Sequence, residues 1–424
     1  MSITVVCGVN WGDEGKGRMV DYLAGDADLV VRYQGGNNAG HTVVNDLGTF
    51  KLHLLPSGIF NPKVMNVLGP GMVIDLEALV SELDDIGAGG IDVSNVRVSD
   101  RATICLPINR NEDVWEETRL GKNAFGSTRR GIAPAYADRY LKKALQVGEV
   151  LDPATLKPRV RALYDWKCRI AEDLYKQDVG STFEDLMDWV QSYGEKVRPL
   201  ICDTSVLLEA AAADGKNILL EAQLGALRDV YFGIYPFTTS SSTLASFAAV
   251  GSGLFSHQPE SVVGVMKAFS SCVGAGPFVT EMEEDEATAL RESSNEFGAS
   301  TGRPRRIGHF DAFASRYGAQ LQGATQIALT KLDSISGRKS LKICTHYEVD
   351  GRELAAFPLN PVLERARPVY AELEGWDADI SKCRSWRALP EPARAYTRTI
   401  EGLIGFPIRY ISVGPERDAL ILRD

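Results

Sequence analysis

The sequence predicts an α/β protein, a single large domain around a mainly parallel central sheet. Three observations support this prediction. Short apolar runs rich in β-branched residues alternate with longer segments of helical period. The glycine-rich stretches are short and directly follow strand-like runs, which is where ligands bind in open α/β sheets. The chain of 424 residues, 44% hydrophobic and 24% charged, is long enough for a large core and has an ordinary globular composition.

The apolar runs are expected to form the sheet. They are nearly continuous and do not alternate with polar residues, which is typical of parallel strands covered by helices on both faces. The runs span residues 3–9, 29–33, 217–222, 262–269, 326–332 and 409–413.

The segments between these runs predict helices and one hairpin. Helical periodicity covers residues 74–86, 155–177, 183–213 and 311–322. Residues 340–357 instead hold two strand-like stretches around an Asp-Gly pair, which favours a tight hairpin. We therefore expect one domain over residues 1–424, with embedded helical and hairpin lobes. The helical insertion is expected at about 100–215, and the hairpin and C-terminal lobe at about 335–424.

Charge and cysteine content exclude several classes of protein. The formal net charge of −10 argues against a general binder of nucleic acid or of a membrane surface, because both need a basic face. The seven cysteines are scattered, without a Cys-x-x-Cys pair or a Cys/His cluster, so we expect neither a disulfide framework nor a zinc site. The sequence has no signal segment and no run of about 18 apolar residues, so we expect a cytoplasmic protein.

The first strand leads into a loop suited to bind phosphate. Residues 8–17 read G-V-N-W-G-D-E-G-K-G, and a helix is expected from about residue 17. Compared with the common P-loop, the spacing from Gly8 to Gly15 is two residues longer, and Gly17 replaces the hydroxyl that would bind Mg²⁺. The backbone amides and the helix N-terminus still form an anion site, and Lys16 can reach the phosphates. Asp13 can supply the missing Mg²⁺ ligand or accept a proton.

A second polar segment, Q-G-G-N-N-A-G-H-T over residues 34–42, directly follows the second strand. Asn38 is a candidate to bind a further phosphate group, and the carbonyl of Gly40 is a candidate metal ligand. His41 is a candidate donor to the negative charge that develops during phosphoryl transfer.

Two later segments predict sites for a base and for carboxylates. T-K-L-D, residues 330–333, closes a strand. In guanine-nucleotide proteins such an aspartate accepts from guanine N1 and N2 while the lysine stem covers the base, so the motif favours GTP over ATP. N-E-F-G-A-S-T-G-R-P-R-R, residues 295–306, gathers three arginines, two hydroxyls and Gly302 in one loop. Guanidinium groups bind carboxylates bidentately, so this loop predicts a carboxylate site.

Taken together, these segments resemble the adenylosuccinate synthetase family. The matching motifs follow the family order over nearly the whole chain. They are W-G-D-E-G-K-G (11–17), V-R-Y-Q-G-G-x-N-A-G-H-T (31–42), V-G-A-G-P-F (273–278), N-E-F-G-A-x-T-G-R (295–303), T-K-L-D (330–333), S-V-G-P (412–415) and I-L-R-D (421–424).

The resemblance implies a GTP- and Mg²⁺-dependent ligase of purine biosynthesis that forms a C–N bond. It would join L-aspartate to the 6-oxo position of IMP through a 6-phosphoryl intermediate, giving adenylosuccinate, GDP and phosphate. It would work as a homodimer with a shared active site, without nucleic acid or membrane as a partner.

The resemblance also implies roles for single residues. Asp13 would deprotonate the purine and bind Mg²⁺ together with Gly40, His41 would stabilise the transfer, and Lys16 would hold the GTP phosphates. The expected GTP-binding residues are Gly12, Glu14, Gly15, Lys16, Gly17, Gly40, His41, Thr42, Arg305, Lys331, Leu332, Asp333, Ser412, Val413 and Gly414. The purine monophosphate would contact Asp13, Asn38, Thr128, Lys142 (from the partner subunit), Gln223, Leu224, Thr239, Val273 and Arg303. L-Aspartate would contact Ala299, Ser300, Thr301, Gly302, Arg303 and Arg305.

The sequence departs from the family pattern in the pocket expected for the purine monophosphate. Arg129 stands where the family has glycine, and Lys142 stands where it has arginine. The family's E-G-A-Q-G reads E-A-Q-L-G at residues 221–225, so Leu224 takes the place of the glutamine that binds the 6-oxygen. Gln223 could replace that glutamine after a one-residue adjustment of the backbone, although in a regular strand it would point to the opposite face.

These departures leave more than one function open. The first is an IMP enzyme with a repaired pocket, and the second is a paralogue that accepts GMP, dGMP or a purine-analogue monophosphate. The third, a non-catalytic GTP-binding regulator, is disfavoured because Asp13, Lys16 and His41 are all present.

Overall fold

The structure is a computed structural model that describes residues 1–298 and 302–423. Ten strands form its central sheet, and all neighbouring pairs are parallel except the last pair at one edge, β19 and β20. In sheet order the strands are β20 (Leu420–Leu422), β19 (Ile408–Ser412), β15 (Gln326–Thr330), β11 (Ser261–Lys267), β1 (Ile3–Gly8), β10 (Ile218–Gly225), β2 (Leu29–Arg32), β5 (Met65–Leu68), β7 (Val96–Ser99) and β9 (Ile201–Cys202). All the runs predicted as strands lie in this sheet.

Helices cover both faces of the sheet. On β1, Val5 and Cys7 pack in one apolar cluster with residues of α7 (Thr204–Ala213) and α8 (Ala248–Ser252). Val6 points to the opposite face and packs with residues of α1 (Lys16–Leu23). Because successive side chains of a strand alternate between faces, a strand covered on both sides must be apolar throughout. This explains the continuous apolar runs of the sequence.

Most predicted helices are present, but one is not continuous. The periodic segments at 74–86, 155–177 and 311–322 correspond to α2 (Leu76–Ala88), α5 (Pro153–Arg169) and α10 (Ala312–Gln322). The single helix predicted over 183–213 is wrong. The chain forms α6 (Phe183–Val197), then strand β9, then α7. Pro199 cannot donate a backbone hydrogen bond inside a helix, and Asp203 caps the new helix by accepting from the amides of Ser205 and Val206.

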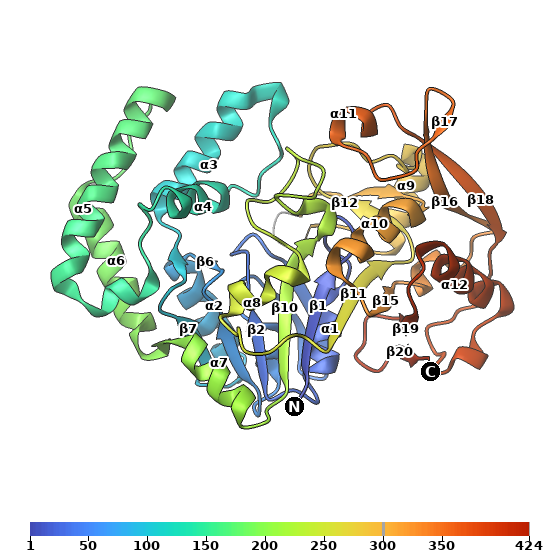
Figure 1. Cartoon of the computed structure of the whole chain (residues 1–424), viewed down its shortest axis with the longest axis horizontal. Helices are drawn as coiled ribbons and strands as arrows, with labels where there is room; N and C mark the ends of the chain where they lie inside the picture. Colours follow the sequence, from blue (N-terminus) through green and yellow to red (C-terminus); the bar gives the residue numbers. More distant parts are fainter. Residues whose placement is uncertain (299–301, 424) are drawn as a thin grey trace.

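Two groups of elements flank the sheet (Figure 1). On one side lie α3 (Pro107–Leu120), α4 (Ile132–Tyr140), α5 and α6, and on the other lie β16 (Ser340–Val349), β17 (Arg352–Glu353), β18 (Arg367–Glu374), α11 (Asn360–Leu363) and α12 (Glu391–Ile404). The predicted hairpin turn is confirmed, since Asp350 and Gly351 have φ values of 52° and 74°. The main partner of β16 is nevertheless β18, because β17 has only two residues.

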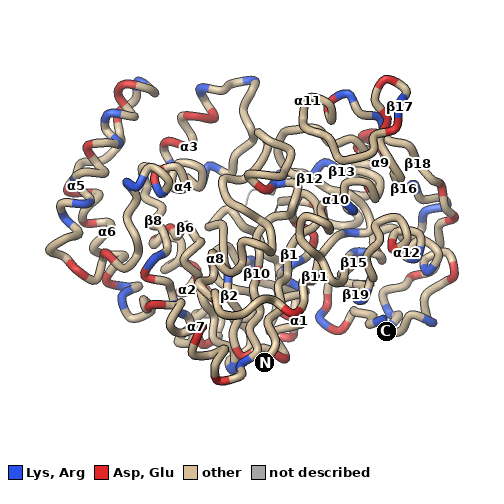
Figure 2. Tube along the Cα trace, viewed as in Figure 1, with Lys and Arg blue, Asp and Glu red and all other residues tan. Residues whose placement is uncertain are grey.

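The remaining elements are short pairs and one helix. They are β3 (His41–Asn45) with β4 (Gly48–Leu52), β6 (Val73–Ile74) with β8 (Thr103–Ile104), β12 (Ser270–Cys272) with β13 (Arg306–Gly308), β14 (Phe310–Asp311) beside β16, and α9 (Glu284–Ser293). Lys and Arg residues and Asp and Glu residues are both scattered over the trace (Figure 2). All seven cysteines are free, and among the helices that the structure describes none is long and apolar enough to cross a membrane.

Candidate active site

A cavity of about 1660 Å³ lies where the parallel strands end. Its wall includes Lys16 from the loop after β1, Gln223 from the end of β10, Lys331 just after β15 and Ser412 at the end of β19. The carboxyl ends of parallel strands meet at one edge of the sheet, so segments far apart in sequence converge there.

Most predicted site residues of the described chain line this cavity. They are Asp13, Glu14, Gly15, Lys16, Gly17, Asn38, Gly40, His41, Thr42, Thr128, Gln223, Leu224, Thr239, Val273, Gly302, Arg303, Arg305, Lys331, Asp333, Ser412 and Gly414. The predicted residues Ala299, Ser300 and Thr301 lie outside the described residues.

The cavity wall does not include the predicted residues Gly12, Lys142, Leu332 and Val413. Leu332 and Val413 are buried, and the amide of Val413 donates to the carbonyl of Ala419 at 3.0 Å. The amide of Leu332 donates to the carbonyl of Ser412 at 3.1 Å, which holds together the segments that follow β15 and β19. Lys142 is exposed at the end of α4 on its own chain.

The phosphate loop is organised around a buried carboxylate. Glu14 Oε1 accepts from the amides of Asn10 at 3.1 Å and Gly12 at 2.8 Å, and Oε2 pairs with Lys16 Nζ at 2.6 Å. A Cβ atom on Gly8 or on Gly225 would lie 2.5 Å from a Glu14 oxygen. Glycine is therefore required at both positions to make room for Glu14. The predicted GTP ligand Glu14 thus shapes the loop from inside and holds Lys16 at the start of α1.

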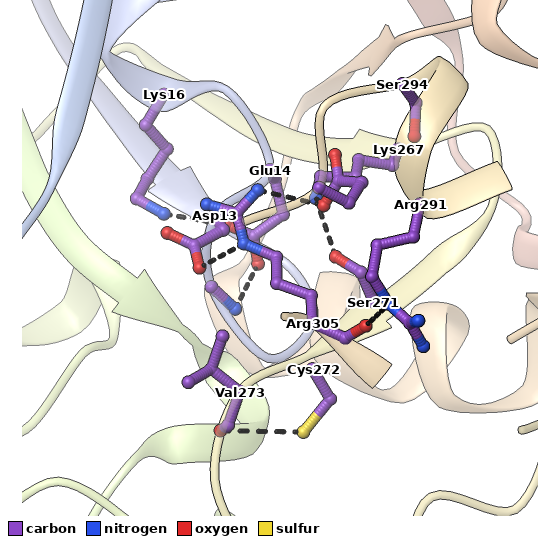
Figure 3. Close-up of polar contacts among 12 residues, drawn as sticks. Asp13, Glu14, Lys16, Lys267, Ser271, Cys272, Val273, Arg291, Ser294 and Arg305 are labelled. Atoms are coloured by element: carbon purple, nitrogen blue, oxygen red, sulfur yellow. Dashed lines mark hydrogen bonds and ion pairs between the residues drawn. The ribbon is translucent and has the colours of Figure 1, made fainter. Parts of the chain in front are cut away.

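Asp13 faces a cationic side chain across the cavity. Its φ of 60° is in the left-handed region, and Arg305 Nε donates to Asp13 Oδ2 at 2.9 Å (Figure 3). Arg305 also donates from Nη1 to Glu296 Oε2 at 2.9 Å. These ion pairs orient Asp13, the predicted base, and Arg305, which belongs to the predicted carboxylate site.

His41 rests on a buried acid that the sequence analysis did not assign. His41 Nδ1 lies 2.5 Å from Glu221 Oε1, and Glu221 also accepts from the amide and hydroxyl of Ser57 at 2.8 and 2.7 Å. Burial alone would raise the pKa of Glu221, but His41 and Arg32 outweigh it and hold the pKa below its usual range. Glu221 therefore stays ionised and fixes the orientation of the imidazole.

Gln223 lines the cavity because β10 is not a regular strand at this point. The pairing of β1 with β10 is regular up to the pair Val6–Glu221, and the next pair is Gly8–Gly225. Between these two pairs β1 advances by two residues and β10 by four, so β10 contains a bulge. Leu224 adopts a φ of 60° within this bulge. As a result, Gln223 and Leu224 both line the cavity.

The side chain of Gln223 is held by polar contacts. Its Oε1 accepts from the amide of Gly36 and from Arg32 Nη2, both at 2.9 Å, and its Nε2 donates to Asn38 Oδ1 at 2.6 Å. A Cβ atom on Gly35 would lie 1.7 Å from Gln223 Oε1, so glycine is needed there. Gln223 therefore orients Asn38, a residue predicted to bind the purine monophosphate.

Arg129 adopts a φ of 57°, a conformation that favours glycine, and its side chain is exposed and does not line the cavity. The bulk and charge that Arg129 adds are therefore not part of the cavity wall. Arg303 instead reaches this loop, where its Nη2 donates to the carbonyl of Gly126 at 3.0 Å.

The part of the cavity predicted to bind guanine contains a carboxylate oxygen that has no partner among the described residues. Asp333 Oδ1 is buried and accepts no hydrogen bond from the described residues, and burial raises the pKa of Asp333. Lys331, with a φ of 58°, donates from Nζ to Glu296 Oε1 at 2.5 Å. A buried acceptor of this kind requires a donor, and guanine N1–H and N2–H supply two.

Sequence reasoning missed Glu221, Glu296 and Lys267. Glu221 and Glu296 lie in the motifs E-A-Q-L-G and N-E-F-G, but their roles depend on contacts with residues far away in the sequence. Lys267 lies at the end of β11, within an otherwise apolar run. A single lysine in such a run is unusual, and it was the feature of the sequence that could have indicated a buried ion pair.

The comparisons with known proteins agree with this geometry. A model of the adenylosuccinate synthetase family matches residues 5–421. Adenylosuccinate synthetase 2 of Pseudoalteromonas translucida is 51% identical over 424 residues, which cover 100% of both chains. The adenylosuccinate synthetase of Caldanaerobacter subterraneus is 41% identical over 425 residues, covering 100% of this chain and 99% of the relative.

Solved structures confirm the predicted fold class. The fully ligated adenylosuccinate synthetase from Plasmodium falciparum matches with a TM-score of 0.94 at 32% identity and 100% coverage of both chains. The succinoaminodeoxyadenylate synthetase of cyanophage S-2L, bound to dGMP and dATP, matches with a TM-score of 0.60 at 18% identity, covering 99% of this chain and 95% of that one, and shows the fold alone. The chain thus belongs to the adenylosuccinate synthetase family, whose members are ligases that form a C–N bond.

Proposed function

We propose that this chain joins L-aspartate to the 6-oxo position of IMP with GTP, giving adenylosuccinate, GDP and phosphate. One observation carries the proposal. The segments suited to phosphate, guanine and carboxylates, which are dispersed along the sequence, line a single cavity. Identity of 51% to a protein named adenylosuccinate synthetase supports IMP as the acceptor.

The residues of the cavity have distinct chemical tasks in this reaction. Asp13 takes the proton from N1 of the purine, so that O6 attacks the γ-phosphorus of GTP and GDP leaves. The amine of L-aspartate then attacks C6 of the phosphorylated purine, and phosphate leaves. Arg305 keeps Asp13 oriented through its hydrogen bond at 2.9 Å.

His41 and Lys16 stabilise the phosphates. Burial lowers the pKa of His41, whereas a phosphate anion next to the ring and the ionised Glu221 at Nδ1 both favour the protonated imidazole. Lys16 and the amides at the start of α1 bind the negative charge of GTP. Asp333 accepts from guanine through its buried Oδ1, while Arg303 and Arg305 bind the carboxylates of L-aspartate.

The donor set of the cavity fits Mg²⁺. Mg²⁺ prefers oxygen ligands and is usually held by one or two carboxylates together with substrate phosphates. Asp13 and the carbonyl of Gly40 both line the cavity on the phosphate side and are the proposed protein ligands. The ion would neutralise charge on the transferred phosphoryl group.

We further propose that the chain forms a homodimer in which Lys142 enters the partner's site. Near the exposed Lys142, the side chains of Tyr140, Leu141 and Tyr231 are 69%, 54% and 70% exposed. Large apolar side chains grouped at the edge of a cavity are typical of a surface that a protein partner covers.

The cytoplasmic location stays a prediction.

Other acceptors and a regulatory role are not favoured. The family relatives favour IMP over GMP, dGMP or a purine analogue, and they favour a ligase over a non-catalytic regulator. The bulge in β10 gives a physical reason why the loss of the usual glutamine is tolerated, because Gln223 lines the cavity with Leu224.

The test is product formation with a panel of acceptors. Phosphate release from GTP would be measured with Mg²⁺, L-aspartate and each of IMP, GMP and dGMP, and the succinylated product would be identified by mass. We expect turnover with IMP alone. Gln223→Ala should lower kcat/KM for IMP by about tenfold or more, because it removes the contacts to Asn38, Gly36 and Arg32.

Leu224→Ala is the matched change on the same bulge and removes no polar contact of Gln223, so its effect on kcat/KM should be smaller. Turnover with dGMP or GMP but not IMP would contradict the proposed acceptor. A larger loss for Leu224→Ala than for Gln223→Ala would contradict the role of Gln223.

A further inference from the structure

A buried carboxylate behind the cavity wall joins three cations. Glu296 is fully buried, and its Oε2 accepts from Lys267 Nζ at 2.5 Å and from Arg305 Nη1 at 2.9 Å. Its Oε1 accepts from Lys331 Nζ at 2.5 Å. Arg305 and Lys331 line the cavity, whereas Glu296 and Lys267 do not. Glu296 therefore holds two substrate-facing cations from behind.

Arg305 is held both at its backbone and at its guanidinium group. Its backbone amide donates to the carbonyl of Glu296 at 3.0 Å, and its own carbonyl accepts from Arg291 Nε at 2.8 Å. The guanidinium binds Glu296 through Nη1. It binds Asp13 through Nε (Figure 3). A planar guanidinium bound at two nitrogens has little freedom to rotate, so Glu296 sets the direction from which Arg305 meets Asp13.

Lys331 is fixed by the same carboxylate at the other end of the cavity. Its Nζ donates to Glu296 Oε1 and to the carbonyl of Ser294 at 2.7 Å. Lys331 is thereby held in the cavity wall, to which Asp333, two residues further on, contributes a buried oxygen that is suited to guanine. One carboxylate thus contacts both the guanine end and the reacting end.

The charges around Glu296 explain why a single carboxylate can bind three cationic side chains. Burial alone would raise the pKa of Glu296, but Lys267, Lys331 and Arg305 outweigh it and hold the pKa well below its usual range. Burial, Arg305 and Lys331 lower the pKa of Lys267 to about 8, although Glu296 opposes this. Lys267 also donates to Ser271 Oγ at 2.6 Å and has its place in the network set by Glu296 and Ser271.

We propose that Glu296 is a positioning residue that sets Arg305 against Asp13 and Lys331 beside guanine, and so fixes both ends of the nucleotide site together. Lys267 completes the network as a cation that touches Glu296 but does not line the cavity. The inference rests on the proposed function, in which Arg305 and Lys331 contact the substrates.

The decisive variant is Glu296→Gln, which keeps the shape of the side chain but removes its charge. We expect the Kd of N-methylanthraniloyl-GDP and the KM of L-aspartate both to rise by about tenfold or more, because two charge-assisted hydrogen bonds are weakened. We expect kcat to fall as well, because Arg305 no longer holds Asp13 in place. Circular dichroism and Tm would report whether the variant is folded.

Glu296→Asp keeps the charge but shortens the side chain by one methylene, so it cannot reach all three cations. We expect the Kd of the GDP analogue and the KM of L-aspartate to rise in a folded protein. If Glu296→Gln does not fold, Glu296→Asp tests the positioning role in its place. Glu281→Gln is the matched control. Glu281 accepts two hydrogen bonds from Arg306, at 2.7 and 2.5 Å. Arg306 follows Arg305 in the chain, but its ion pair with Glu281 is partly exposed. We expect the loss of the Glu281 charge to leave both constants unchanged.

The outcomes separate this inference from the proposed function. A folded Glu296→Gln or Glu296→Asp protein with unchanged affinity for the GDP analogue, or with unchanged KM for L-aspartate, would overturn the joint role. Binding of the GDP analogue requires no acceptor. If the wild type fails to use IMP while Glu296→Gln still weakens nucleotide binding, the acceptor is wrong and the positioning role stands.

Discussion

Asp333 lies three residues beyond the end of β15, and its carboxylate oxygen Oδ1 is buried and unpaired within the described structure. Guanine presents donors at N1 and N2, whereas adenine has an acceptor at N1, so a carboxylate accepts from guanine and repels adenine. The raised pKa that burial imposes on Asp333 is the cost of keeping this acceptor out of water. A ligand that donates two hydrogen bonds offsets that cost.

Asp333→Asn should therefore change the preferred nucleotide. The amide keeps one acceptor and gains a donor, which suits the 2-oxo group of xanthine better than the 2-amino group of guanine. We expect kcat/KM for GTP to fall by roughly 100-fold and XTP to become the better substrate, as measured by phosphate release with each triphosphate. A variant that still prefers GTP would exclude Asp333 from base recognition.

Single residues differ in how far the sequence reveals them. The places of Asp13 and Lys16 in the cavity wall could be predicted because both residues lie between a strand and a helix. For Gln223 the sequence left two directions open, because its direction depends on a bulge that the pairing of β10 with β1 forms. Glu296 could not be assigned either, because its three cationic partners come from other parts of the chain.

At the scale of elements, the helices beside the cavity are joined by a buried ion network. Lys167 of α5 is 1% exposed, and its Nζ lies 2.6 Å from Glu112 of α3 and 2.5 Å from Asp138 of α4. Asn109 donates to both carboxylates, at 3.2 and 2.8 Å. A single lysine therefore compensates two buried acids and ties three helices together. Burial raises the pKa of Glu112, although Lys167 opposes this.

Lys167→Met should destabilise this group of helices, because it leaves two buried carboxylates without a cation. Breaking a buried pair in this way typically costs about 3–5 kcal/mol. Urea denaturation at about pH 8 would measure the loss of unfolding free energy. Lys216→Met removes the exposed pair with Asp28 and should cost less than about 1 kcal/mol.

The pH dependence gives a second measurement on the same variant. A carboxyl group whose folded-state pKa lies above its unfolded value binds a proton more tightly in the folded state. Its stabilising protonation is complete below the unfolded pKa and is lost as the pH rises through the folded pKa. For Glu112 the shift is upward, and the loss of Lys167 increases it. The destabilisation by Lys167→Met should therefore be smaller at about pH 5 than at about pH 8, and an equal loss at both would contradict the electrostatic explanation.

For the whole molecule, the cavity follows from the class of the sheet. The phosphate loop at residues 8–17 and the Ser412–Gly414 segment lie at opposite ends of the chain, yet both follow strands that run in the same direction. Parallel strands place their carboxyl ends at one edge, so the sequence alone predicts that these segments meet. It does not predict the spacing between them, which depends on twist, bulges and buried ion pairs.

The shared site of the proposed homodimer gives a prediction for the assembled protein. Lys142 does not line the cavity of its own chain, so in the proposed dimer each site combines Asp13 of one protomer with Lys142 of the other. Asp13→Asn and Lys142→Ala should each abolish or strongly reduce turnover when pure. In an equal mixture that re-equilibrates, half of the dimers are mixed, and each mixed dimer has one site with both residues intact. We expect recovery of about a quarter of wild-type activity, with light scattering giving twice the chain mass. No recovery from an exchanging dimer would show that Lys142 does not complete the partner's site.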